Sequence, residues 1–147
     1  MSDSIKVLFK HDAFETESYE SAWVKVENDT YILDNILFYA KEYSCGDTIS
    51  VIKVGDEYHV AGLIKESGHT TIRMLIEDVS KVGEIRNEIK ELGCSSEGSN
   101  IDMLISVDVP SSVSYPKVLE YLDAGENNGL WGYEEACISS IHRNQTS

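Results

Sequence analysis

The spacing of apolar residues changes near residue 78, and this change constrains the fold more than any other feature of the sequence. Before it, short apolar runs rich in β-branched and aromatic side chains alternate with turn-forming residues, a pattern typical of strands. The runs cover residues 5–9, 22–26, 31–33, 36–39, 48–54, 58–64 and 70–76. Residues 1–78 are therefore predicted to be the mainly β half, folded as a curled antiparallel sheet or a small barrel.

Two glycine-containing pairs predict how neighbouring strands connect. Gly55 with Asp56, and Ser67 with Gly68, have the composition of tight hairpin turns, because glycine adopts the positive φ that such turns require. The strand after Gly68 would then pair with the strand before Ser67 and also begin the second half. We therefore expect residues 1–147 to form a single compact domain.

Helical spacing begins after the change. Apolar residues recur on one helix face at Val79, Val82, Ile85, Ile89 and Leu92. This spacing predicts a helix near residues 80–92, and Gly93 is placed to end it in a left-handed conformation. Ser114 and Pro116 are typical of a helix start, so a second helix is predicted near residues 115–124.

Strands are predicted around these two helices. They cover residues 72–77, 94–97, 101–109 and 131–138. The order strand, helix, strand, strand, helix, strand is that of a ferredoxin-like split βαβ unit, which we assign to residues 72–138. The predicted fold class is therefore α+β, with a curled sheet or small barrel fused to a ferredoxin-like half.

The charge of the chain restricts its partners. With 12 basic and 26 acidic residues, the formal net charge is -14. Such a surface repels phosphate backbones and anionic lipid headgroups, so neither nucleic acid nor a membrane is expected as a partner. The same field speeds association with a cationic protein. A basic protein is therefore the expected partner.

Other features predict a cytoplasmic protein without cofactors. The chain has no apolar run long enough to span a membrane and no N-terminal signal pattern. Its cysteines, Cys45, Cys94 and Cys137, are odd in number and far apart, which argues against disulfides and zinc sites. Glycine-rich phosphate loops are absent as well. We expect no metal, nucleotide or other cofactor.

The run Ser-Gly-His-Thr-Thr at residues 67–71 is the most catalytic-looking segment, since a histidine beside hydroxyl groups can act as a general base. In a strand, however, His69 and Thr71 lie on one face and Thr70 on the other. We also expect no carboxylate beside His69 to orient its ring. The favoured interpretation is a hairpin turn with a surface histidine; a general base and a binding contact are the alternatives.

A second candidate segment combines aromatic and acidic residues. Glu134 and Glu135 follow Trp131 and Tyr133 closely. Adjacent strand residues point to opposite faces, so a catalytic carboxylate pair is disfavoured. The alternatives are one solvated and one half-buried glutamate, or an acidic rim around an aromatic binding anchor. Trp131 would be that anchor unless it belongs to the core.

Several separated motifs resemble a bacterial domain family of unknown function. They are the ten residues 31–40, residues 46–47, 67–73 and 92–94, and the run Trp-Gly-Tyr-Glu-Glu-Ala-Cys at 131–137. The resemblance spans about residues 20–138. Members of that family often have proline where this chain has Leu37. The resemblance implies a bacterial cytosolic origin and transfers no catalytic residue.

These observations favour a binding protein over an enzyme. The first hypothesis is a monomeric bacterial immunity protein that neutralises a cognate toxin domain, expected to be a cationic nuclease. The rival is an enzyme or a regulatory domain with a small-ligand site between the two halves, using Asp34, Asn35, His69 and Arg73. A scaffold module is the third. The expected partner-binding residues are Trp131, Tyr133, Glu134, Glu135, Asp34, Asn35 and His69.

Overall fold

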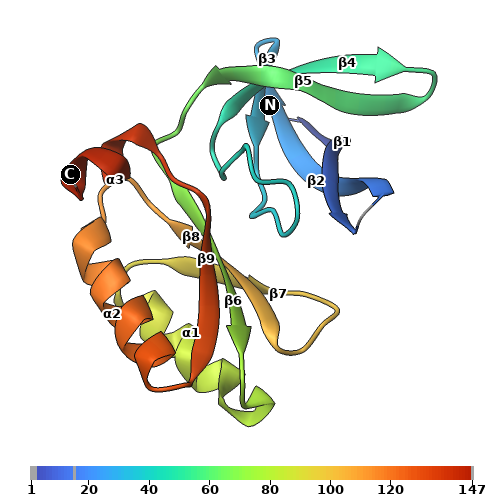
Figure 1. The fold of residues 1–147 in the computed structure, drawn as a ribbon. Coiled ribbons are helices and arrows are strands. Elements are labelled where there is room, and N and C mark those ends of the chain that lie inside the picture. Colours follow the sequence, from blue (N-terminus) through green and yellow to red (C-terminus); the bar gives the residue numbers. More distant parts are fainter. Residues whose placement is uncertain (1–2, 15, 147) are drawn as a thin grey trace.

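The computed structural model describes residues 3–14 and 16–146, which form two sheets and a set of helices (Figure 1). The first sheet contains β1 (Asp3–Phe14), β2 (Thr16–Glu27), β3 (Thr30–Leu33), β4 (Thr48–Val54) and β5 (Glu57–Lys65). The second contains β6 (Thr70–Ile76), β7 (Ser95–Gly98), β8 (Leu104–Val109) and β9 (Trp131–Cys137). The helices are η1 (Val79–Lys81), α1 (Val82–Glu91), α2 (Tyr115–Asn127) and α3 (Ser140–Gln145). The fold class is α+β, as the sequence predicts.

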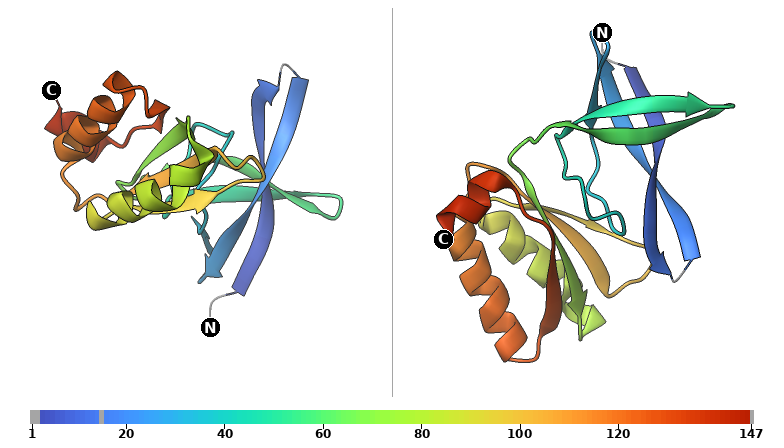
Figure 2. Two further views of the ribbon diagram at one scale, coloured as in Figure 1. Left: turned by 90° about the horizontal axis from the view of Figure 1, so that it is seen from below. Right: turned by 45° about the horizontal axis from the view of Figure 1, so that its top comes forward.

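The first sheet closes into a ring. Successive strands from β1 to β5 pair antiparallel, and a single parallel pairing of Leu8 with His59 joins β1 to β5. Figure 2 shows the long β1–β2 hairpin lying crosswise to the β4–β5 hairpin. The predicted turn at Gly55 and Asp56 is confirmed, since Val54 pairs with Glu57 and Gly55 has a φ of 62°.

The predicted strand at residues 36–39 is wrong. This segment belongs to an irregular loop, residues 34–47, that connects β3 to β4. The carboxylate of Glu20 accepts hydrogen bonds from the backbone N–H groups of Phe38, Tyr39 and Ala40, so these donors do not pair with a strand. The segment is apolar because Leu37 and Ala40 are buried in the core of the ring.

The second sheet has the strand order β7-β8-β6-β9, with neighbouring strands antiparallel. Helices α1 and α2 cover one of its faces (Figures 1 and 2). They bury the alternate strand residues Ile72, Met74 and Ile76 of β6, together with apolar residues of β8. The predicted order strand, helix, strand, strand, helix, strand is found along residues 70–137.

The two predicted helices are present, and a third was missed. Gly93 ends α1 with a φ of 95°, as its position predicted. Ser114 precedes α2 at the N-cap position, although the first backbone N–H of the helix, that of Tyr115, donates to the side chain of Gln145 instead. Helix α3 has only six residues. It begins at the Ser139 side chain, which accepts from the N–H of His142.

The predicted hairpin at Ser67 and Gly68 is wrong. Strands β5 and β6 belong to different sheets, and this pair carries the chain from one to the other. Gly68 does have the predicted positive φ, 92°, but a side chain there would meet Ser111 and Ile141. The local turn chemistry was predicted correctly, while contacts far along the sequence decide the direction of the chain.

None of the helices formed by residues 3–14 and 16–146 is long and apolar enough to cross a membrane.

Candidate functional site

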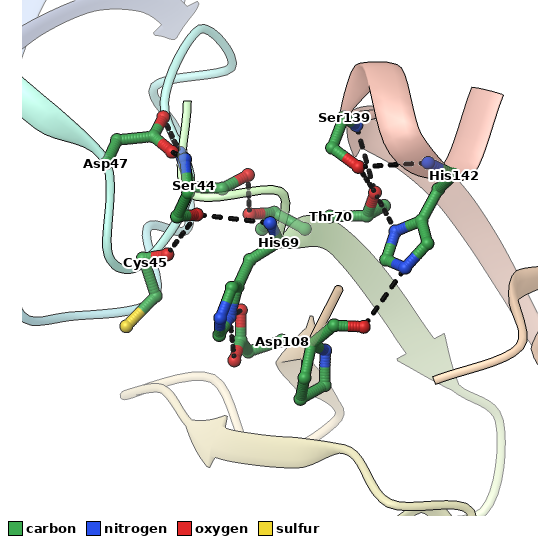
Figure 3. A network of polar contacts seen from close by, with 11 residues as sticks. Ser44, Cys45, Asp47, His69, Thr70, Asp108, Ser139 and His142 are labelled. Carbon is green, nitrogen blue, oxygen red and sulfur yellow. Dashed lines mark hydrogen bonds and ion pairs between the residues drawn. The ribbon is translucent and has the colours of Figure 1, made fainter. Parts of the chain in front are cut away.

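A network of polar side chains joins the two sheets where loop 34–47 meets β6 and β8 (Figure 3). We call it the polar junction, and it consists of Ser44, Asp47, Ser67, His69, Thr71 and Asp108. Elsewhere on the same loop, the carbonyl oxygens of Leu37 and Phe38 accept hydrogen bonds from Ser106 and Arg73. The loop therefore packs its apolar side chains into the ring and contacts the four-stranded sheet through both backbone carbonyls and polar side chains.

Asp47 organises the loop side of the polar junction. Its buried carboxylate accepts from the N–H of Ser44 and from the N–H of Ser67, both at 2.9 Å. The Ser67 hydroxyl donates to the carbonyl of Cys45 at 2.8 Å and accepts from the N–H of His69 at 3.1 Å. The hydroxyl groups near His69 are thus hydrogen bonded within the protein. These bonds give the serine and threonine residues of the run 67–71 a structural role.

The ring of His69 is oriented by a carboxylate, so the expectation that none lies beside it was wrong. His69 Nδ1 lies 2.9 Å from both carboxylate oxygens of Asp108. The two residues are 39 positions apart, and the pairing of Thr71 with Asp108 across β6 and β8 brings them together. Burial raises the pKa of Asp108, while the hydrogen bond from His69 lowers it. The His69 side chain is 28% exposed and that of Asp108 only 8%.

Cys45 follows Ser44 of the polar junction and lies in the same region as His69 and Asp108 (Figure 3). A cysteine near a histidine and an aspartate invites comparison with nucleophilic catalysis, which requires a thiolate. Burial, followed by the negative charges of Asp108 and Asp34, raises the pKa of the Cys45 thiol to about 12. The thiol is therefore protonated at neutral pH, and this environment disfavours a nucleophilic role.

A second histidine lies deeper and has a structural role. His142 is fully buried, with Nδ1 2.6 Å from the Thr70 hydroxyl and Nε2 3.0 Å from the Pro110 carbonyl. Its ring stacks on Tyr115. Burial lowers the pKa of His142, so the ring is neutral, donating through Nε2 and accepting at Nδ1. No pattern in the sequence indicates this network, since its members come from β6, α3 and the turn after β8.

The described contacts do not bring the four residues of the rival enzyme hypothesis into one cluster. Asn35 accepts from the backbone N–H of Trp23 at 2.6 Å, and Asp34 lies 3.8 Å from Lys25 Nζ, both within the ring. Arg73 bridges the Phe38 carbonyl and Glu134. His69 is paired with Asp108 instead. Among the described residues, no group of three or more histidine, cysteine, aspartate or glutamate residues is arranged to hold a metal ion.

The aromatic residue of the predicted binding segment belongs to the core. Trp131 is only 4% exposed, and its Nε1 donates to the Leu122 carbonyl at 3.0 Å. It packs against Gly125 so closely that a Cβ on this glycine would lie 1.9 Å from the indole. Trp131 is therefore corrected from an exposed anchor to a core residue, because α2 covers the face of β9 to which it points.

The other residues of the segment remain nearer the surface. The Tyr133 hydroxyl donates to Asp123, and Glu135 accepts from the Tyr115 hydroxyl at 2.6 Å. Glu134 forms ion pairs with Lys41 and Arg73 on the opposite face of β9. The two glutamates thus point to opposite faces, as strand alternation predicts.

Exposed apolar side chains lie on the segments that meet at the end of the sheet where β6 finishes. We call this set the end patch, and it consists of Leu75, Val79, Met103 and Leu130, each between 40% and 52% exposed. Backbone hydrogen bonds hold its segments together: Ile76 N–H donates to the Met103 carbonyl, and Glu77 N–H to the Leu130 carbonyl. The end patch combines three segments, residues 75–79, 103 and 130, that are far apart in the sequence, so no local pattern indicates it.

A cavity of about 200 Å³ opens beside the end patch between α1 and the start of β9. Ile76, Ile85, Leu130 and Trp131 form its apolar lining. Four carboxylates and one amine surround this lining, from Glu77, Asp78, Glu84, Glu88 and Lys81. Leu130 belongs to both the end patch and this cavity, so the end patch adjoins a cavity with an acidic rim.

The two sheets define an α+β protein in which a ring of five strands is joined to a four-stranded sheet backed by helices. The chain belongs to the family described as a domain of unknown function (DUF4265), whose model matches residues 20–133. A solved structure of a hypothetical protein from Neisseria gonorrhoeae is similar, with a TM-score of 0.78 and 21% sequence identity. The match covers 95% of this chain and 96% of that one, and it shows the fold alone. No curated protein matches the sequence.

Proposed function

We propose that this protein is an acidic binding protein of the bacterial cytosol, and specifically an immunity protein that neutralises a cationic toxin domain. The observation that carries the proposal is the end patch with the carboxylate rim of the adjoining cavity. An apolar centre surrounded by polar groups is the usual anatomy of a protein–protein interface. The net charge of -14 favours a basic partner.

The chemistry of the rim supports a nuclease as the toxin. A nuclease binds phosphates through lysine and arginine side chains, and carboxylates are the groups that such a surface would accept in place of phosphates. Leu130 and Met103 then provide the apolar anchors. Trp131 supports the site from beneath, because it lines the cavity and is itself buried.

If the immunity proposal is correct, a toxin domain is encoded beside this protein's own gene, and the test uses that domain. Its association is followed by surface plasmon resonance for the wild type, for the patch variant M103D/L130D and for the rim variant E77Q/D78N/E84Q. The matched control is D56N/E57Q, which removes charge from the turn between β4 and β5. Circular dichroism checks that all variants are folded.

We expect the patch variant to raise Kd about 100-fold, mainly through faster dissociation, as for the loss of central anchors. The rim variant should slow association, and raising the ionic strength from about 0.05 M to 0.5 M should slow wild-type association about tenfold. The control should behave as the wild type. Unchanged rates in the patch variant would remove the end patch from the interface, and no binding to the neighbouring toxin would overturn the immunity proposal.

A second candidate function rests on the pair formed by His69 and Asp108. A partly exposed imidazole held by a buried carboxylate is an arrangement that general bases use, which favours an enzyme or a small-ligand regulatory domain. The variants H69Q and D108N separate the two functions. If the protein acts by binding through the end patch, both variants that fold should inhibit the toxin as well as the wild type does. Loss of protection in a stable H69Q variant that still binds the toxin with wild-type rates would favour the second candidate.

A further inference from the structure

Helix α1 carries opposite charges on its two flanks. Glu84 and Glu88 line the cavity beside the end patch. Arg86 and Lys90 lie four residues apart on the other flank and face the edge strand β7. The helix thus separates an acidic apolar site from a basic polar groove.

The groove between α1 and β7 has a volume of about 520 Å³, within the range of small-molecule sites. Its lining is formed by two basic side chains, Arg86 and Lys90, together with Gly83, Asn87, Cys94, Ser95 and Ser96. Within residues 3–14 and 16–146, no carboxylate contributes to this lining. Such a composition is notable on a chain whose net charge is -14.

Arg86 is held in place before any ligand arrives. Its Nε donates to the Ser96 hydroxyl and its Nη2 to the Ser96 carbonyl, both at 2.9 Å. Nη1 lies toward Gly98, where a Cβ would come within 3.6 Å of it. A guanidinium fixed in this way loses little conformational freedom when it binds an anion, so the site is pre-organised.

The two charged side chains that line the groove, Arg86 and Lys90, are both basic. Lys90 adds an ammonium group one helical turn from Arg86, and Asn87 adds an amide between them. Glu97 is on β7 too, but it follows Ser96, which bonds Arg86, so strand alternation directs its side chain to the other face of the sheet. At 0.15 M ionic strength charges beyond about 8 Å are largely screened, so the nearest basic groups dominate the field.

We propose that this groove binds the oxyanion group of a small ligand, with Arg86 and Lys90 contacting the oxygens and Asn87 donating through its amide. Phosphate esters and carboxylates share this chemistry. The site is separate from the end patch, because α1 lies between them, and it does not depend on the immunity function.

The experiment titrates ¹⁵N-labelled protein with inorganic phosphate and, separately, with acetate, at constant ionic strength. The backbone amide signals of Gly83, Ser95, Ser96 and Gly98 report on the groove. K90Q is the principal variant, because the described contacts do not tie Lys90 to β7. K117Q on α2 is the matched control, and R86Q is the second variant.

We expect saturable shifts of these signals with phosphate in the wild type and in K117Q. K90Q should raise Kd about tenfold, the effect of losing one charge-assisted hydrogen bond. Saturation with phosphate alone assigns a phosphate ester as the ligand class, and saturation with acetate too extends the class to carboxylates. Shifts that do not saturate, or that are equal in K90Q and K117Q, mean an adventitious ion only and overturn the proposal.

Discussion

The four-stranded sheet and the ring bury their cores in different ways. In the four-stranded sheet, helices pack on one face, so the buried residues alternate along β6 and recur at helical spacing in α1. In the ring, the strands curl around their own core, and Leu37 and Ala40 of an irregular loop complete it. The core of the four-stranded sheet can be predicted from the local spacing of apolar residues. The core of the ring depends instead on contacts between residues that are distant in the sequence.

The loop that completes the ring also joins the two regions. Its apolar side chains pack in the ring, while its backbone carbonyls accept from Ser106 and Arg73 of the four-stranded sheet. The polar side chains of Lys41 and Ser44 also contact that sheet. Asp47 and Ser67 add the contacts at the crossing between β5 and β6. A perturbation of the loop should therefore affect the ring directly, and the four-stranded sheet only through these polar contacts.

The largest expected effect is on the four-stranded sheet, at Gly125. In the G125A variant the new Cβ would lie 1.9 Å from Trp131, which is itself packed against α2. We expect the free energy of unfolding to fall by about 3 kcal/mol, the upper part of the range for overpacking. Urea denaturation followed by tryptophan fluorescence measures it.

The matched control for this prediction is G132A on β9, where a Cβ meets nothing within 4 Å. It should change the free energy of unfolding by less than about 0.5 kcal/mol. Equal losses of unfolding free energy in G125A and G132A would mean that the close packing of Gly125 on Trp131 does not determine the stability of this core.

The next effect is on the ring, at Glu20. Its carboxylate accepts three backbone N–H groups from residues 38–40, and glutamine in its place offers only one acceptor oxygen. We expect E20Q to lower the free energy of unfolding by about 2 kcal/mol. Amide hydrogen exchange should be accelerated at residues 38–40 before it changes in β6 or β8.

The exposed Glu17, which pairs with Lys10 at the surface, supplies the control for this experiment. E17Q should have little effect, because exposed ion pairs contribute roughly 0–1 kcal/mol. If exchange in E20Q increases equally in both sheets, the two regions unfold as one unit and the contrast between them does not extend to their stability.

These two sites also show how far the sequence predicts the fold. The spacing of Ile85, Ile89 and Leu92 with Gly93 after them predicted α1, because each of these signals is local. Residues 36–39 have strand composition, but the carboxylate of Glu20 takes their backbone donors. No pattern within the segment itself indicates such a contact.

The candidate sites were harder to predict for the same reason. Strand alternation correctly placed Glu134 and Glu135 on opposite faces. The partner of His69 is Asp108, 39 residues away, and only the strand order brings them together. The end patch likewise joins the ends of three segments. Side-chain direction was therefore predictable, but side-chain partners were not.

A smaller effect is the pH dependence of the free energy of unfolding, which we expect from His142. This histidine contacts Thr70 of the four-stranded sheet. Burial lowers the pKa of this histidine below its usual value of 6.5, so below pH 6.5 the unfolded chain binds a proton that the folded protein excludes. Stability is therefore fully present above pH 6.5 and declines as the pH falls toward the folded pKa. The slope contributed by one such group is at most about 1.4 kcal/mol per pH unit.

Urea denaturation at several pH values between 7 and 5 measures this slope, and H142Q is the comparison variant. H142Q should be less stable at pH 7, because the ring bonds to Thr70 and Pro110 change. Its slope over this interval should be shallower than that of the wild type. Identical slopes would assign the pH dependence to other groups and leave His142 without a role in it.

The smallest expected effect returns to the ring, at Gly55 in the turn between β4 and β5. Here a Cβ would meet nothing within 4 Å, but the backbone has a φ of 62°. G55A should therefore lower the free energy of unfolding by about 1 kcal/mol, the cost of a left-handed conformation without any steric clash. G55N should cost less than G55A, since asparagine tolerates positive φ better than alanine. At Gly125 the order is set by size instead, so G125N should be worse than G125A. If asparagine lowers the free energy of unfolding more than alanine at both glycines, side-chain size also determines the effect at Gly55. The expected difference between the ring and the four-stranded sheet would then not hold at this position.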